Sequence, residues 1–404
     1  MKYNAWTLAL IGAGVVSLPA VARADEHTNA VLTALSTTTI SGYVDTSMQW
    51  NPGTGNQNLP AITPNGKPGG TKADGFNLDV LALTLSKPAG EEAWSAGYNA
   101  TLLFGPDAVG YNNSAGSTSS DFSLKDAYVD LHAPLGNGLD VKLGTFTEVL
   151  GYEVYETGNN PNYTRSYGYE IEPTALTGAL ATYQLTSAVS VNGGICDTWS
   201  AGVNTRSDPP KAESFKTYMG SLTYTCPTNS GFLSGSTLSG GAINGYDAIN
   251  GVDKTSLYIG GTFNTPITNV KVGAAYDYAM LGPNNIGGPA HQSGYQGAFG
   301  LYLSWQATAK LALYTRGEYF TESGYLAGAA DTPGYGALGI AGTASSAFEV
   351  TETAQYDLWK NVLARLEFRW DHAEHGAGFG GFEAGAAPTA ENAFMLAANF
   401  VYKF

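Results

Sequence analysis

Hydrophobic and polar side chains alternate with a period of two along most of this chain. In NVLARLEFRWD, residues 361–371, every second side chain from Val362 to Trp370 is apolar, and the intervening positions carry mainly charges. A strand points successive side chains to opposite faces, so this pattern predicts a strand with one apolar and one charged face. The stretches ISGYVDTSMQW, VKVGAAYDY and KLALYTRGEYF repeat the pattern.

The same period predicts sixteen strands. They cover approximately residues 39–50, 75–87, 93–105, 122–133, 138–149, 174–186, 188–199, 213–226, 231–244, 254–265, 268–280, 293–306, 309–320, 346–358, 361–371 and 391–404. The segment 231–244, GFLSGSTLSGGAIN, is the weakest of them because Gly and Ser dominate it.

The connections between these strands alternate between long and short. The long ones cover residues 51–74, 106–121, 150–173, 200–212, 245–253, 281–292, 321–345 and 372–390, while short turns such as PLGNG separate the remaining pairs. An antiparallel meander with its long loops at one end produces this alternation. Omitting the weak ninth strand would break the parity, so it is retained.

We therefore predict an all-β fold: a transmembrane antiparallel up-and-down β-barrel of about sixteen strands, with short periplasmic turns and long outer loops. A closed barrel satisfies every backbone group and has no edge, and bacterial barrels have an even number of strands. A soluble sandwich is the alternative, but one meander offers no obvious second sheet. Six tryptophans suit interfacial girdles: Trp50, Trp94, Trp199, Trp305, Trp359 and Trp370.

Composition agrees with many strands joined by Gly-rich turns. Hydrophobic residues make up 43% of the 404 residues, charged residues only 13%, and there are 52 glycines. Beyond the start of the chain, no apolar run of the length needed for a transmembrane helix occurs. No basic stretch is dense enough for nucleic-acid binding.

Residues 1–24 have the pattern of a secretory signal peptide. A short positive start at Lys2 precedes an apolar stretch, and Ala22-Arg23-Ala24 forms a small-x-small cleavage site. A membrane anchor is the alternative, although the apolar run is too short to span a bilayer. Cleavage leaves one barrel domain, residues 25–404, with 17 basic and 34 acidic residues, a formal charge of −17.

The loop at 150–173 is a candidate constriction. It contains Glu153, Glu156, Arg165, Glu170 and Glu172 among many tyrosines. If it folds outward it is an ordinary exposed loop. If it folds inward it narrows the pore and, with charges on the wall, creates a transverse field. We expect the inward path, and Arg165, the only basic residue of the loop, is then the best candidate for a positive contact.

Further charges are expected to line the pore or its constriction. They are Glu148, Asp126, Asp130, Arg316, Glu318, Arg365, Glu367 and Arg369. We find no nucleophile motif, phosphate loop or Cys-x-x-Cys, and hence no catalytic residues and no cofactor. His372, Glu374 and His375 resemble a metal-ligand set, but in a Gly-rich loop they are more simply solvated.

Two cysteines, Cys196 and Cys226, invite a disulfide in an exported protein. The predicted register argues against it. Strands seven and eight are joined by residues 200–212, so residues that face each other have numbers summing to about 412. Cys196 then faces Lys216 or a neighbour, and Cys226 lies near the opposite end, too far for a bond.

The sequence resembles the outer-membrane β-barrel porins of Gram-negative bacteria. Four stretches carry the resemblance: TTISGYVDTSMQW, LLFGPDA, KDAYVDLHAPLGNGLDVKLGTF and GYEVYETGNNPNYTRSYGYEIEPTALTG. The final FVYKF is common to outer-membrane barrels generally. The resemblance covers most of the chain, is sharpest over residues 38–180, and implies an outer-membrane pore without catalytic residues.

A sixteen-strand barrel leaves an aqueous channel, which predicts passive diffusion of small polar solutes and ions. The acidic excess favours cations, and similar porins suggest a homotrimer surrounded by outer-membrane lipids. Two alternatives stay open. One is a substrate-specific, sugar-type channel with tyrosine platforms, and the other is a structural or adhesive barrel.

The end of the chain, AANFVYKF, is expected to be the closing strand. Phe400, Tyr402 and Phe404 fall on the lipid face, while Asn399 and Lys403 face water. The terminal aromatic resembles the signal that the barrel-assembly machinery recognises. We therefore expect Phe404 at the periplasmic rim, beside the strand at 39–50.

Overall fold

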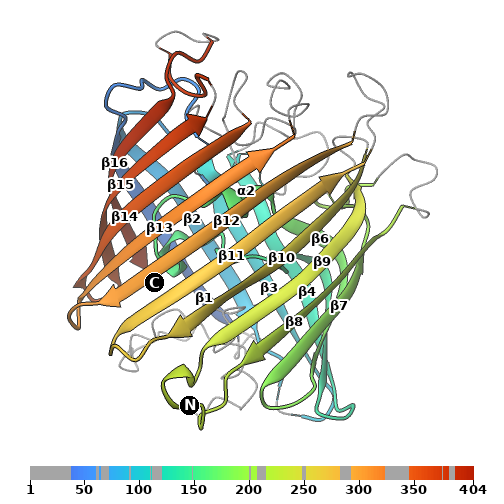
Figure 1. Ribbon diagram of the computed structural model, residues 1–404. Coiled ribbons are helices and arrows are strands. Elements are labelled where there is room, and N and C mark those ends of the chain that lie inside the picture. Colours follow the sequence, from blue (N-terminus) through green and yellow to red (C-terminus); the bar gives the residue numbers. More distant parts are fainter. Residues whose placement is uncertain are drawn as a thin grey trace.

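A computed structural model shows an antiparallel barrel whose strands tilt steeply around one interior (Figure 1). It describes residues 38–60, 63–64, 72–90, 92–109, 111, 121–147, 149–199, 202–206, 215–247, 252–282, 293–323, 345–374, 376–381 and 387–404. Within these residues, sixteen strands pair each with its neighbour in sequence, and β1 pairs with β16 to close the barrel. The predicted signal peptide, residues 1–24, lies outside the described residues.

The strands have the following bounds: β1 Thr39–Trp50, β2 Gly75–Lys87, β3 Ser95–Phe104, β4 Phe122–Ala133, β5 Leu139–Thr147, β6 Ala175–Gln184, β7 Val189–Cys196, β8 Thr217–Thr225, β9 Thr237–Asp247, β10 Val252–Asn264, β11 Val270–Leu281, β12 Gly294–Gln306, β13 Leu311–Glu322, β14 Ser346–Trp359, β15 Val362–Glu374 and β16 Asn392–Lys403. Short helices occupy the connections: η1 Pro106–Ala108, η2 Thr157–Asn159, α2 Tyr167–Ile171 and η4 Gly231–Leu233. No helix among the described residues is long and apolar enough to cross a membrane.

The predicted fold class is confirmed, and most strand bounds agree to within three residues. The ninth strand is the main correction, because β9 begins at Thr237 rather than at residue 231. The preceding residues form η4 and a turn in which Gly231 and Gly235 have positive φ, a conformation that glycine adopts at little cost. The connection 226–236 is therefore longer than 248–251, so the alternation of short and long connections fails here.

The two faces of the barrel follow the alternation. On β15 the outward Leu366 is 67% exposed, whereas the inward Arg365 and Glu367 are 2% and 3% exposed. Trp50, Trp94, Trp305 and Trp359 are also exposed, as expected for girdle positions. Trp199 is a correction: it is buried inside, where its ring packs under Lys254 and its Nε1 donates to Ser256.

The predicted register between the seventh and eighth strands, which separates the two cysteines, is confirmed. Cys196 on β7 faces Thr217 on β8, one residue from the predicted partner, while Cys226 lies just beyond the other end of β8. Both cysteines are free.

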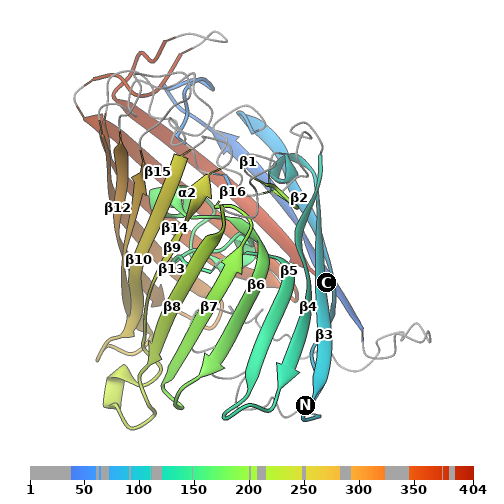
Figure 2. The same ribbon diagram turned by 90° about the vertical axis from the view of Figure 1, so that its right-hand side faces the viewer.

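A segment of chain between β5 and β6 occupies the interior. Residues 150–173, here called the inner loop, carry η2 and α2, and Figure 2 shows α2 inside the ring of strands. Asn162, Thr164, Arg165 and Tyr167 of this loop are at most 1% exposed. The inner loop therefore takes the inward path.

Phe404 lies next to β1, as predicted. Its N–H and C=O exchange hydrogen bonds of 2.9 and 3.0 Å with Gly42, which continues the pairing of β16 with β1. A Cβ at Gly42 would lie 2.7 Å from the Phe404 ring, so the glycine makes room for the terminal aromatic. The ring is still 48% exposed toward the outside.

Deletion of Phe404 is expected to lower the amount of folded barrel in the outer membrane several-fold, because the last rung of the closing ladder and its aromatic contact are lost. The conductance of those barrels that do insert should be unchanged. Heat-modifiable migration on gels measures the folded fraction. Tyr218→Ala, at the start of β8 on the far side of the barrel, is the matched control for loss of an exposed aromatic, and normal assembly without Phe404 would contradict this role.

Candidate functional site

The inner loop is shaped by its own side chains. Asn160 accepts a hydrogen bond from Val154 N at 2.9 Å and donates to Val154 O at 2.6 Å, which ties the turn around η2. Ser166 caps α2 by accepting from Tyr169 N at 3.1 Å. Asn and Ser favour such local bonds to backbone, so this part of the conformation is encoded locally.

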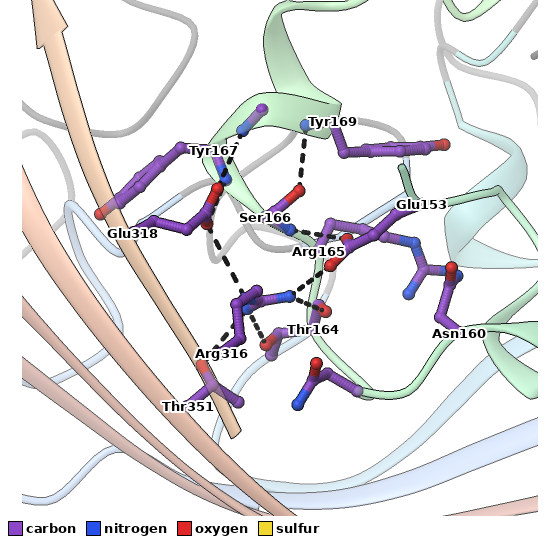
Figure 3. Close-up of polar contacts among 12 residues, drawn as sticks. Glu153, Asn160, Thr164, Arg165, Ser166, Tyr167, Tyr169, Arg316, Glu318 and Thr351 are labelled. Atoms are coloured by element: carbon purple, nitrogen blue, oxygen red, sulfur yellow. Dashed lines mark hydrogen bonds and ion pairs between the residues drawn. The ribbon is translucent and has the colours of Figure 1, made fainter. Parts of the chain in front are cut away.

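Arg316 on β13 fastens the loop to the barrel wall (Figure 3). Its guanidinium pairs with Glu153 at 2.8 Å and donates to Thr164 O at 2.9 Å, so one side chain holds two distant parts of the loop. It also pairs with Glu349 of β14. All three side chains, Arg316, Glu153 and Glu349, are buried. Removing one of them would therefore leave an opposite charge buried without that ion-pair partner.

The short helix α2 sits on the same wall. Glu318 of β13 accepts hydrogen bonds from Tyr167 N at 2.8 Å and Gly168 N at 3.3 Å. The Tyr167 hydroxyl donates to Asp371 of β15 at 2.7 Å. Arg369 pairs with Asp371, also at 2.7 Å, and packs over the Tyr167 ring, so α2 is held at its backbone and through its aromatic ring.

Residues of β15 also hold the backbone between η2 and α2. Glu367 accepts hydrogen bonds from Tyr163 N and Thr164 N, the latter at 2.9 Å. Arg365 donates to Thr157 O at 2.8 Å and to Asn160 O. The charged face that predicted a pore lining therefore binds the loop.

The loop also reaches other walls of the barrel. Tyr152 stacks on Tyr302 of β12, with 3.9 Å between ring centroids, and shares a 2.8 Å hydrogen bond with Thr262 of β10. Glu156 pairs with Lys125 of β4 at 3.0 Å. The inner loop thus spans the interior and is fixed at β4, at β10 to β12 and at β13 to β15.

A further polar cluster lies beside the loop at β1 and β2. Lys72 pairs with Asp79 at 3.2 Å and with Asp107 at 2.8 Å, and the hydroxyl of Tyr163 donates to Ser47 at 2.9 Å. Burial raises the pKa of Asp107 to about 6, although Lys72 opposes the shift. Sequence reasoning missed Lys72 and Asp107 because both come from connections, where no alternation marks the inward face.

Arg165 corrects one expectation. It is 0% exposed, and its guanidinium donates to Tyr163 O, Tyr155 O and Thr157 within the loop itself. It therefore presents no charge to open water in this structure. Its role is to hold the loop together.

The remaining predicted residues have several surroundings. Asp126 pairs with Lys125 at 3.1 Å, Asp130 lies opposite Lys142 nearer the turn 134–138, and the carboxylate of Glu172 packs over Gly151. Glu148 lies outside the described residues. His372 and Glu374 bond to Asn392 and Ser346 respectively, and His375 also lies outside the described residues.

A cavity of about 540 Å³ lies between the inner loop and the short-turn end of the barrel. Its lining includes Asn160 of the loop and Tyr258, Thr262, Lys271, Tyr314 and Lys403 of the wall. Lys403 also donates to Gly158 O at 2.9 Å, which places the last strand beneath η2. The lining mixes hydroxyl, amide and ammonium groups with aromatic rings, as a passage for polar solutes requires.

The family model described as "Putative beta-barrel porin-2, OmpL-like" matches residues 37–404. The chain belongs to this family of porins. It is therefore a β-barrel porin of the Gram-negative outer membrane. No curated protein gives a significant match.

Solved structures agree with this porin fold. The outer membrane channel DcaP of Acinetobacter baumannii aligns with a TM-score of 0.57 at 12% identity, covering 91% of this chain and 97% of that one. The anion-selective porin from Comamonas acidovorans aligns with a TM-score of 0.57 at 14% identity, covering 91% and 99%. OmpT of Vibrio cholerae, described in its trimer form, aligns with a TM-score of 0.55 at 11% identity, covering 91% and 99%. At these identities the likeness concerns the fold alone.

Arg316→Met is expected to release the inner loop of this porin. The substitution leaves Glu153 buried without its cation and Glu349 with Arg369 alone, 4.0 Å away, and removing one partner of a buried pair typically costs about 3–5 kcal/mol. Cleavage by protease within residues 150–173 should become faster, and single-channel conductance should rise. Lys310→Met, in an exposed turn, is the control, and a protease-resistant loop in Arg316→Met would contradict the assignment.

The buried carboxyl group of Glu170 in α2 predicts that the stability of the folded inner loop depends on pH. Burial raises the pKa of its carboxyl well above the usual value, and its Oε1 is buried without a hydrogen-bond partner among the described residues. The folded state therefore binds this proton more tightly than the unfolded state does, so its stability falls as pH rises above about 4.3. Loop proteolysis, corrected for protease activity, should be faster at pH 8 than at pH 5.

The matched variant for this prediction is Glu170→Gln, which carries no titrating proton. Its loop should be cleaved at more similar rates at the two pH values. An identical pH dependence in the native protein and in Glu170→Gln would assign the effect to other groups.

Proposed function

We propose that this porin passes small polar solutes and ions by passive diffusion, through a path that the inner loop narrows. The observation that carries the proposal is the attachment of the loop across the interior, by Arg316, Glu367 and Tyr152, above a polar cavity. A fixed loop sets the width of the path, because the surrounding wall is a rigid ladder of backbone hydrogen bonds. Catalysis is not part of the proposal.

The proposed channel prefers cations weakly. Residues 25–404 carry 34 acidic and 17 basic side chains, so the protein around the path has an excess of negative charge. Fixed charge in a narrow path selects permeating ions of the opposite sign. Anion selectivity is a property of the Comamonas acidovorans porin, and 14% identity does not transfer it to this chain.

The proposed assembly is a homotrimer surrounded by outer-membrane lipids and inserted by the barrel-assembly machinery. Support comes from the trimer form described for the Vibrio cholerae protein of the same fold. The exposed aromatic at Phe404 supports recognition of the last strand during insertion.

A substrate-specific channel is the second candidate. Tyr258, Tyr302 and Tyr314 line the cavity, and aromatic faces bind the apolar faces of sugars. Tyr302 already stacks on Tyr152, which occupies one of these rings and favours the general channel. Block of the ion current that saturates with sugar concentration would favour the specific channel.

Reconstitution in planar bilayers tests the proposal. We expect stepwise conductance and, in a KCl gradient, a reversal potential of the sign that indicates cation preference. A reversal potential of opposite sign would refute the selectivity but leave the channel. The absence of conductance steps, in both the native protein and Arg316→Met, would refute the channel and favour a structural or adhesive barrel.

A further inference from the structure

One carboxylate lies on the outer wall of the barrel, where apolar side chains are expected. Glu352 is in the middle of β14, and it is exposed together with Phe348 and Tyr356, four residues away on either side. The intervening Glu349, Thr351 and Thr353 point inward and are buried. Glu352 therefore shares the membrane-facing side of the strand with two aromatic residues that flank it.

Lipid tails cannot satisfy this carboxyl group. Its Oε2 accepts one hydrogen bond, from the hydroxyl of Thr315 on β13 at 2.9 Å. A carboxylate has about four acceptor sites, and hydrocarbon supplies no donor for the others. Ionisable groups at membrane depth are costly and usually have a partner, so the position calls for a second donor from outside this barrel.

An apolar groove of about 800 Å³ borders Glu352. It crosses the outer wall from β13 through β16 to β1 and β2, the orange-to-red strands of Figure 1 and their blue neighbours. The small side chains Ala354 and Ala398 line it, with Leu366, 67% exposed, and Trp50, 57% exposed. Large side chains therefore project beside small ones, and this uneven apolar surface can interlock with the wall of another barrel.

We infer that this wall is the contact between copies of the chain, and that Glu352 accepts a hydrogen bond from the neighbouring copy. The inference rests on the homotrimer of the proposed function and adds the face through which it forms. An acyl chain would fill the groove but leave the carboxyl group with Thr315 alone. A second copy can fill the groove and also supply a donor.

The spacing of strands suggests the donor. When three equal cylinders touch one another, each cylinder has two lines of contact, one with each neighbour, and these lines are about 60° apart around its circumference. In a sixteen-strand barrel this angle corresponds to nearly three strands. β14 and β1 are three positions apart in the closed barrel. On β1 the outward, mid-strand polar residue is Thr46, whose hydroxyl makes only a long 3.4 Å bond to Phe400 O. We therefore assign Thr46 of one copy as the donor to Glu352 of the next.

Cysteine cross-linking in membranes tests the wall. In a background of Cys196→Ala and Cys226→Ser, Ala398→Cys should give dimers and trimers with a bismaleimide. Leu222→Cys, outward on β8 at the far side of the barrel, should not. Cross-linking through Leu222→Cys alone would overturn the wall while leaving the homotrimer intact. If neither cross-links and the purified protein has monomer mass, the inference and the homotrimer both fail, whereas the channel is judged separately by its conductance.

Substitutions at Glu352 test its partner. Glu352→Leu and Thr46→Val should each lower the trimer fraction at limiting concentration by at least about tenfold, because each of the three interfaces loses one hydrogen bond to a charged group. Glu352→Gln keeps an acceptor and should retain most of the trimer, and Thr255→Val, outward on β10, should have no effect. Heat-modifiable migration checks that each barrel has folded. If Glu352 instead faces lipid, leucine suits hydrocarbon better and the trimer fraction should not fall, so an unchanged trimer in Glu352→Leu would overturn the assignment.

Discussion

A strand in hydrocarbon finds no water for its N–H and C=O groups, and the whole of this structure depends on meeting that requirement. Sixteen strands meet it only because the last returns to the first: β16 pairs with β1 from Trp50 at one end to Tyr43 at the other, and Phe404 extends the ladder to Gly42. Closure removes both edges at once. It also encloses an interior too wide for wall side chains to fill, and that space is where function is decided.

The interior is occupied by a segment of the chain that is held chiefly by charge. Arg316, Arg365 and Arg369 are buried not because the wall is closed at these positions but because the inner loop covers them. Taking such ions out of water is costly, and pairing with Glu153 and Asp371, with further bonds to loop carbonyls, offsets the cost. The arrangement therefore specifies one position for the loop, since a loop lying elsewhere in the interior would lose these ion pairs and hydrogen bonds.

The two surfaces of the barrel follow opposite rules, and their exceptions are informative. Inside, the aromatic Tyr302 of β12 marks where Tyr152 of the loop packs against the wall. Outside, the polar Glu352 and Thr315 interrupt an apolar surface beside a groove. In each case the residue that breaks the alternation lies where a second piece of protein is, or is proposed to be, in contact.

The sequence by itself determined the barrel: alternation in residues 361–371 predicted β15, and the same signal located all sixteen strands and the Cys196 register. It succeeded because strand faces are a local property with a period of two, and it misplaced the start of β9, where Gly and Ser carry little contrast. Only the tertiary structure decided what the inward charges do. Glu153 and Arg316 are 163 residues apart, and no local pattern reveals that they meet. For the same reason the sequence suggested that Arg165 is a pore charge, although it binds its own loop, and it gave no sign of the pair formed by Lys72 and Asp107. Burial of these side chains depends on contacts with the inner loop, and those contacts form only after the barrel has closed.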